Sequence, residues 1–228
     1  MKTIKHLSLA AAALAGMAFS SCNIGGDTYS GPTLEDQKQM ISSLGAQKEG
    51  GFVYYNGNDE NIKDVLDTIP SISVRFATNT TKDANGNVQS YYSVGYFQFP
   101  VKMLSNFISQ EDLADAIAEL DPVSLKANFI PYSVYTQAFV VNSYDIELGD
   151  IRTPEKEYKN VVIKFYNNQC LAGTETTNDQ NKKSYWCFYM QPAYIYVNGQ
   201  PTNYLQYYKF NNSTFEPIFK FTTDINKE

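Results

Sequence analysis

The pattern of hydrophobic and polar residues follows the two-residue period of β-strands along most of the chain. Residues 71–77 alternate strictly between apolar and polar side chains, and residues 91–99 are apolar on both faces, as in a strand covered on both sides. Asn85-Gly86 lies between these runs and suits the tight turn of a hairpin. We therefore predict an antiparallel pair here, and further strands at 52–55, 125–135, 138–148, 161–166, 185–190, 194–197, 204–210 and 215–221.

Apolar residues with the spacing of an α-helix occur only in short segments of the chain. One helix is predicted between Thr33, whose hydroxyl can cap the first turn, and Gly45. A second opens with a capping box at residues 109–112 and ends before Pro122, and the apolar residues 101–108 predict a short helix between the two. Because strands do not alternate with helices, we expect an α+β fold. It should have a mostly antiparallel, strongly curved or barrel-like sheet, with two or three helices packed at one face or end.

The first 22 residues have the features of a lipoprotein signal. Lys2 and Lys5 precede an apolar run that is too short to span a bilayer, and small residues then lead to Cys22. This arrangement resembles the lipobox, in which the cysteine is acylated after cleavage, and Ser-Ser before the cysteine resembles the form common in Bacteroidetes. We expect a signal peptide over residues 1–21, a flexible tether over 22–32 and a single globular domain over 33–228. Acyl chains on Cys22 would anchor the protein to a membrane of the cell envelope, in the periplasm or at the outer-membrane surface.

Charge and composition disfavour several partners and chemistries. The predicted signal peptide holds two of the 18 basic residues and none of the 24 acidic ones, which leaves the mature chain with a net charge of −8. A nucleic-acid partner needs a basic patch and is therefore not expected. His6 is the single histidine and lies in the signal peptide, so the mature chain has no Ser-His-Asp triad, Cys-His pair or histidine-bound metal. We expect no metal, no cofactor and no enzymatic activity.

Two cysteines of the predicted domain, Cys170 and Cys187, flank a polar stretch. If the strands on either side of that stretch pair with each other, the two thiols could face one another. The oxidising envelope would then favour a disulfide worth roughly 3 kcal/mol. The alternative is two buried thiols that pack as small apolar side chains. The sequence leaves both interpretations open.

An aromatic-rich region surrounds the only tryptophan. Tyrosine and tryptophan rings bind sugar faces and protein partners when they are exposed, and pack in the core when alternation turns them inward. The core is the more frequent outcome for such a run. The candidate binding aromatics are Tyr185, Trp186, Tyr194, Tyr196, Tyr204, Tyr207 and Tyr208.

An acidic cluster offers the one route to catalysis without histidine. Asp145, Glu147 and Asp150 lie near a predicted strand end, and paired carboxylates hydrolyse glycosidic bonds. With 24 acidic residues in the chain, a solvated strand face is the simpler interpretation.

The segment YFQFP at residues 96–100, the apolar pair at 103–104 and the predicted helix over 113–120 complete the pattern. Together with the lipobox and the tyrosine-rich strands, they resemble small lipoproteins of gut Bacteroidetes that are grouped as domains of unknown function. This resemblance implies a cell-envelope location and no known activity.

The sequence therefore favours a non-enzymatic envelope lipoprotein that binds a glycan, a peptide or a partner protein. Three alternatives stay open. The chain could carry a small apolar ligand inside the curved sheet, hydrolyse a substrate with two carboxylates, or act as a structural or pilus-like subunit.

Overall fold

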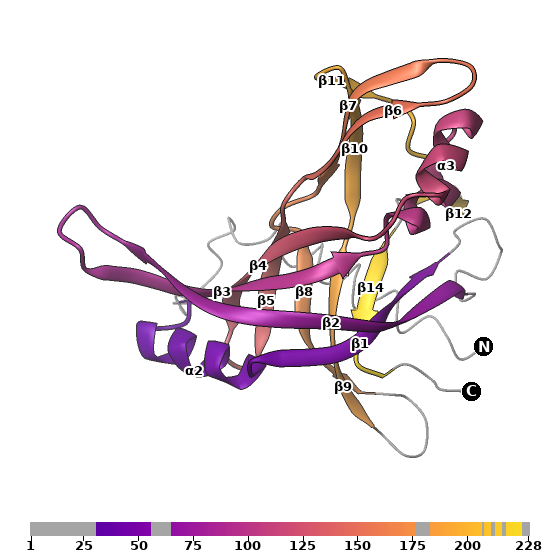
Figure 1. Cartoon of the computed structure of the whole chain (residues 1–228). Coiled ribbons are helices and arrows are strands. Elements are labelled where there is room, and N and C mark those ends of the chain that lie inside the picture. The colour runs from indigo at the N-terminus through magenta and orange to yellow at the C-terminus, as the bar shows by residue number, and fades with distance from the viewer. Residues whose placement is uncertain are drawn as a thin grey trace.

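The centre of the molecule is a closed antiparallel barrel (Figure 1). The computed structural model describes residues 31–55, 65–176, 183–206, 208–210, 213–215 and 218–224. The predicted signal peptide, Cys22 and nearly all of the tether lie outside the described residues. In order around the barrel, the strands are β1 (Gln47–Tyr55), β14 (Phe219–Thr222), β9 (Ser184–Met190), β8 (Cys170–Thr176), β5 (Ala138–Ser143), β4 (Val123–Ser133), β3 (Val88–Phe99) and β2 (Val65–Lys82). The predicted α+β class with a barrel-like antiparallel sheet is confirmed.

A second, smaller sheet stands at one end of the barrel (Figure 1). The hydrophobic pattern did not predict it, because residues 138–148 read as one strand. The structure divides that strand at Tyr144 and Asp145, so that β5 stays in the barrel and the following strand joins the smaller sheet. Its strands, in spatial order, are β11 (Gln200–Thr202), β10 (Pro192–Val197), β7 (Glu157–Phe165) and β6 (Ile146–Arg152); β12 (Tyr208–Phe210) and β13 (Ser213–Phe215) form a separate pair.

The first described helix, α2 (Leu34–Leu44), has the predicted start. The Thr33 hydroxyl accepts the backbone N–H of Asp36, and the Asp36 carboxylate accepts the backbone N–H of Thr33 at 3.0 Å, which completes a capping box. Met40 and Leu44 bury their side chains in the barrel core. The helix therefore contributes apolar surface to the same core as the strands.

The second predicted capping box, at the start of α3 (Glu111–Ala118), is wrong. The helix has no side-chain cap, because the Asp112 carboxylate accepts hydrogen bonds from the Tyr158 phenol at 2.6 Å and the Thr153 hydroxyl at 2.9 Å. These bonds tie α3 to the β6–β7 hairpin. The apolar cluster before it forms a short 3-10 helix, η1 (Val101–Phe107), as predicted.

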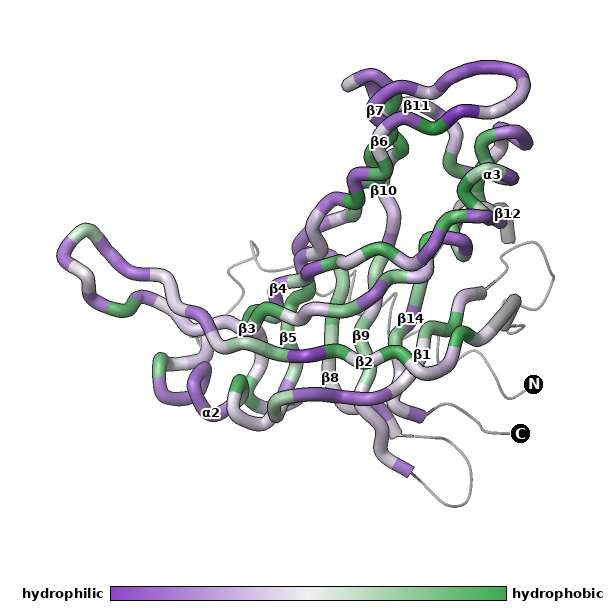
Figure 2. Tube along the Cα trace, viewed as in Figure 1, coloured by the Kyte–Doolittle hydropathy of each residue, from purple (hydrophilic) through white to green (hydrophobic). Residues whose placement is uncertain are grey.

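Aromatic rings fill the described barrel interior. Phe188 is fully buried and makes ring contacts with five neighbours, at centroid distances of 5.1–5.9 Å: Phe52, Phe97, Phe129, Trp186 and Phe221. Figure 2 shows the hydrophobic residues recurring along the barrel strands and the hydrophilic ones gathering at the hairpin tips. An interior occupied by packed rings argues against the carrier alternative.

The β2–β3 hairpin extends well beyond the barrel as a two-stranded arm (Figure 1). The predicted turn is present at its tip. The Asp83 carboxylate accepts the backbone N–H groups of Asn85 and Asn87, each at 2.8 Å, and Gly86 has a φ of 85° that favours glycine.

Candidate functional site

Three tyrosine rings gather on the outer face of the smaller sheet. In the pairing of β10 with β7, Ile195 lies opposite Ile163 and both are buried, so the alternate positions Tyr194 and Tyr196 point away from the core. The ring of Tyr194 lies 6.3 Å from that of Tyr166, which follows β7, and 6.4 Å from that of Tyr196. Tyr194 is 43 % exposed, so this group offers aromatic surface to a ligand.

An ion pair lies beside these rings. Lys164, opposite Tyr194 in the ladder, places its Nζ 3.1 Å from the Asp145 carboxylate and 5.0 Å from the centre of the Tyr196 ring. The hydrogen bond to Asp145 and its negative charge raise the pKa of Lys164. We call the set Tyr166, Tyr194, Tyr196, Lys164 and Asp145 the tyrosine face. It combines aromatic surface with hydrogen-bond donors and acceptors.

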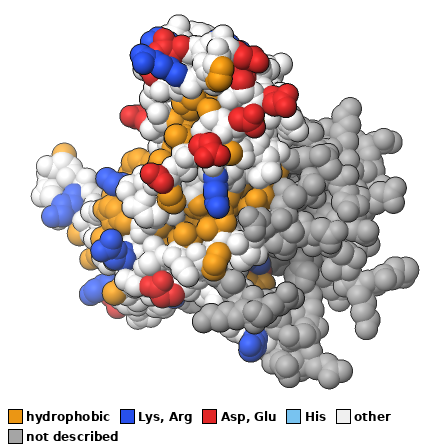
Figure 3. Space-filling view, turned by 45° about the vertical axis from the view of Figure 1, so that its right-hand side comes forward, with side chains coloured by type: hydrophobic (Ala, Val, Ile, Leu, Met, Phe, Trp, Pro, Cys, Tyr) orange, Lys and Arg blue, Asp and Glu red, His pale blue; other side chains and the backbone are white. Residues whose placement is uncertain are grey.

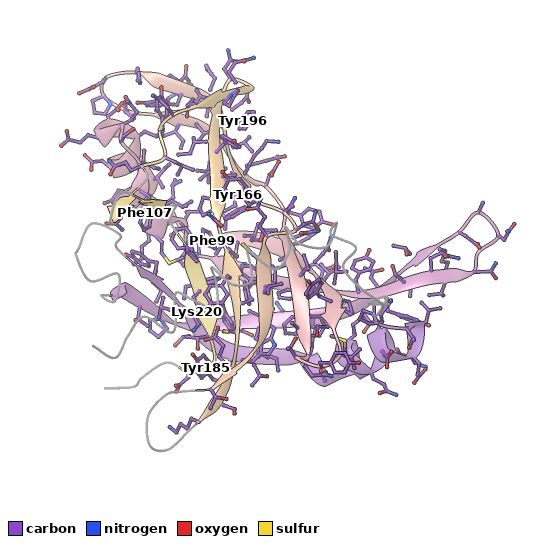
Figure 4. The ribbon with its side chains drawn as sticks, turned by 180° about the vertical axis from the view of Figure 1, so that it is seen from behind. Phe99, Phe107, Tyr166, Tyr185, Tyr196 and Lys220 are labelled. Atoms are coloured by element: carbon purple, nitrogen blue, oxygen red, sulfur yellow. The ribbon has the colours of Figure 1, made fainter. Side chains whose placement is uncertain are left out.

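A second cluster lies on the outer side of the barrel, where β8, β9 and β14 meet. The Glu175 carboxylate accepts from Lys220 Nζ at 2.7 Å and from the phenols of Tyr185 and Tyr189 at 2.7 and 2.6 Å. Lys220 also lies over both rings, 4.8 Å from the centre of Tyr185 and 5.4 Å from that of Tyr189. Figure 4 shows Lys220 and Tyr185 of this cluster on the barrel, well separated from Tyr166 and Tyr196 of the smaller sheet.

The electrostatics of this glutamate–lysine cluster indicate a structural role. Burial alone would raise the pKa of the Glu175 carboxyl, but Lys220 and the two phenols outweigh burial and lower it to about 2. Burial and the hydrogen bond to Glu175 raise the pKa of Tyr185 to about 12. At neutral pH the ion pair is charged and the Tyr185 phenol is protonated, so Glu175 is too weak a base and Tyr185 too weak an acid for proton transfer.

A family model described as a domain of unknown function, DUF4840, matches residues 45–197. The chain belongs to this family. Comparison with curated proteins and with solved structures finds no significant match. The DUF4840 segment contains the whole tyrosine face, whereas Lys220 of the second cluster follows the matched residues.

Only some of the predicted aromatics reach the tyrosine face of this DUF4840 chain. Tyr194 and Tyr196 do, and Tyr185 belongs to the glutamate–lysine cluster. The prediction that Trp186 is a binding residue is wrong. Its side chain is 9 % exposed and packs in the barrel core against Phe76 and Phe129.

Of the three remaining predicted aromatics, the structure describes the side chain of one. The Tyr204 ring is half-buried and packs on Tyr158 at 6.3 Å. Tyr207 and the side chain of Tyr208 lie outside the described residues. Tyr166 was not among the predicted aromatics, although the buried positions of the strand before it, Ile163 and Phe165, fix an outward direction for the next residue.

The disulfide interpretation is wrong, and both cysteines are free and buried. In the β8–β9 ladder Ala172 lies opposite Phe188 and Gly173 opposite Cys187. Cys170, two residues before Ala172, therefore points into the barrel, whereas Cys187 points to the outer face. Thiols on opposite faces of a sheet cannot bond. Burial raises the pKa of both thiols, that of Cys170 to about 12, so they are inert at neutral pH.

Two of the three residues in the predicted acidic cluster, Asp145 and Asp150, have separate basic partners on the smaller sheet. Asp145 pairs with Lys164, and Asp150 accepts the backbone N–H of Asn160 at 2.9 Å and Lys159 Nζ at 3.2 Å, which lowers the pKa of Asp150. A glycosidase acid needs a raised pKa, so this pairing argues against the carboxylate hydrolase. Figure 3 shows charges of both signs gathering at the end of the molecule that carries α3 and the β6–β7 hairpin.

Two features are absent from the described part of the chain. No group of three or more His, Cys, Asp or Glu side chains is placed to hold a metal ion there. None of its helices has the length and hydropathy needed to cross a bilayer.

Proposed function

We propose that this DUF4840 chain is a lipid-anchored, non-enzymatic binding module of the cell envelope, and that it contacts a glycan through the tyrosine face. The observation that carries the proposal is the grouping of Tyr166, Tyr194 and Tyr196 on an open sheet face beside the Lys164–Asp145 ion pair. The module would bind its ligand along a surface.

The chemistry of the tyrosine face favours a glycan over a protein or peptide. Sugar rings pack their C–H faces on aromatic rings and offer hydroxyl groups, which both donate and accept hydrogen bonds. An ammonium, a carboxylate and the phenol groups lie within the same small area here and suit such hydroxyls. A protein interface would instead bury Lys164 and Asp145, which costs desolvation energy, and charged groups are depleted from interface centres.

Replacing Tyr194 with Ala should weaken glycan binding about tenfold, which corresponds to about 1.4 kcal/mol. Tyr194 is the central ring of the face and contacts both of its aromatic neighbours. The full-length chain, purified from membranes in detergent, would be screened on a glycan array, and the affinity of any bound glycan would be measured by calorimetry.

Tyr135→Ala is the matched control, because Tyr135 is 92 % exposed in the turn between β4 and β5. It should leave both binding and the unfolding midpoint unchanged. Equal affinities of wild type and the Tyr194 variant would refute the proposal, as would an array on which the wild-type chain binds nothing. If the chain instead binds a defined peptide or protein, and this binding requires Tyr194, the ligand of the tyrosine face is of that class and not a glycan.

The anchor is tested separately, because it rests on Cys22 and the signal sequence alone. Replacing Cys22 with Ser should move the protein from the membrane fraction to a non-membrane fraction and abolish incorporation of labelled palmitate. The matched control is Cys187→Ser, which removes a buried thiol of the domain and should leave the label in place. Palmitate labelling that persists in the Cys22 variant would contradict the proposed anchor.

A further inference from the structure

The β2–β3 arm carries a free strand edge. Strand β1 pairs with β2 only as far as Gln47 opposite Arg75, and β4 pairs with β3 only from Ser93 opposite Phe129 onward. Beyond these points, the rest of β2 and β3 pair only with each other among the described residues. The arm is therefore a two-stranded ribbon with one edge on each side.

The two edges of the ribbon differ. On the β3 edge, the backbone N–H of Tyr91 donates to the side-chain oxygen of Gln37 in α2 at 2.8 Å. On the β2 edge, the N–H of Phe76 donates to the carbonyl oxygen of Ala46 at 2.9 Å, the last such bond before the ribbon leaves the barrel. Helix α2 thus covers one edge and leaves the other open.

The open edge presents unpaired backbone groups in a fixed direction. Along a strand, the N–H and C=O of alternate residues point to the same side, so those of Thr78 and Thr80 point the same way as those of Phe76. Within the described chain, no other strand lies against them. Natural sheets protect exposed edge strands from pairing, often with charged side chains. In β2, Lys82 is the single charged residue near the end of the strand.

The ribbon is held in shape before any partner arrives. The Asp83 carboxylate accepts from four donors on three residues of the turn region: the backbone N–H groups of Asn85 and Asn87 and the side-chain amides of Asn87 and Gln89. The hydroxyls of Thr81 and Ser90 also contact across the two strands at 2.6 Å. A preformed edge lowers the ordering cost of adding a strand.

We propose that the open β2 edge binds an extended peptide segment of a partner protein, by strand addition, and that this segment carries acidic side chains. The backbone groups of Thr78 and Thr80 would pair with the added strand. Arg75 and Lys82 are exposed at the two ends of this stretch, and no acidic residue lies between them. A second copy of the chain fits less well, because its own β2 edge would bring a second Arg75 and Lys82 against the same two cations.

A labelled synthetic peptide, Glu-Val-Thr-Val-Thr-Val-Glu, tests this with the full-length chain in detergent by fluorescence anisotropy. Thr80→Pro should weaken binding at least tenfold, because proline removes the outward N–H and is tolerated on an edge strand. The matched control Thr80→Val keeps both the N–H and the β-branched shape, and it should bind like wild type. Replacing both glutamates of the peptide with lysine should also weaken binding.

A measurement on the wild-type chain keeps the test decisive if the proline variant fails to fold. A peptide methylated at alternate backbone nitrogens cannot pair along one edge, and it should lose binding to the wild-type chain. Equal binding of methylated and unmethylated peptides would overturn strand addition, as would wild-type affinity in a folded Thr80→Pro variant. If the chain forms dimers and Thr80→Pro abolishes them, the open edge binds a second copy of the chain. That result would also overturn the proposal.

Discussion

Replacing Lys220 with Met should lower the free energy of unfolding by about 3 kcal/mol at neutral pH. The ammonium group is buried against the Glu175 carboxylate, with side-chain exposures of 10 % and 12 %. Its removal leaves a buried carboxylate that keeps two phenol donors and has no counter-charge in the cluster. Equilibrium unfolding in urea, followed by tryptophan fluorescence of Trp186 in the barrel core, measures the change.

Two further measurements separate this ion pair from ordinary side-chain packing. Adding Glu175→Gln to the Lys220→Met variant should restore part of the lost stability, because it removes the unpaired charge. The pKa of Glu175 is about 2 in the folded chain, below its ordinary value of 4.5. Because the pKa of Glu175 is lower in the folded than in the unfolded chain, the ion pair stabilises the fold fully above about pH 5. This stabilisation is lost as the pH falls towards 2. The difference between wild type and Lys220→Met should therefore shrink over that range, and a difference independent of pH would contradict the ion-pair explanation.

Local signals in the sequence located the turns and most strands. Asp83 and Gly86 form the predicted arm turn, and the Asn-Gly dipeptide at 198–199, both residues with positive φ, forms the turn after β10. These turns depend on residues close together in the chain. Closure of the barrel does not, because β1 pairs with β14 across most of the sequence, with Gly51 opposite Thr222. No pattern within a short window could identify that partner.

The direction of the aromatic side chains was equally hard to read. The run from Tyr185 to Tyr189 is apolar at every position, so either set of alternate residues could face the core. The structure turns Trp186 and Phe188 inward and the two tyrosines outward to Glu175. A shift of one residue in register would exchange the two sets. The glutamate–lysine cluster was therefore hidden in the sequence, since Lys220 is 45 residues from its partner.

Replacing Phe188 with Ala should lower the free energy of unfolding by about 3–5 kcal/mol. Phe188 has no exposed surface, and it stacks on Phe221 at 5.1 Å and packs edge-on against Phe52 and Phe129. Removing the ring therefore leaves a cavity among fixed neighbours. Because a domain is stable by only about 5–15 kcal/mol, the unfolding midpoint in urea should fall sharply.

Phe188→Leu is the matched control, since it keeps most of the buried volume and should cost less than about 1.5 kcal/mol. The same variants decide whether the barrel interior can carry a ligand. A small apolar molecule such as benzene should stabilise the Phe188→Ala chain, which has a cavity to hold it, and leave the wild type unchanged. If instead the alanine variant costs under 1 kcal/mol and benzene stabilises the wild type, the interior already contains a void. The apolar carrier would then be a better explanation of this barrel than surface binding.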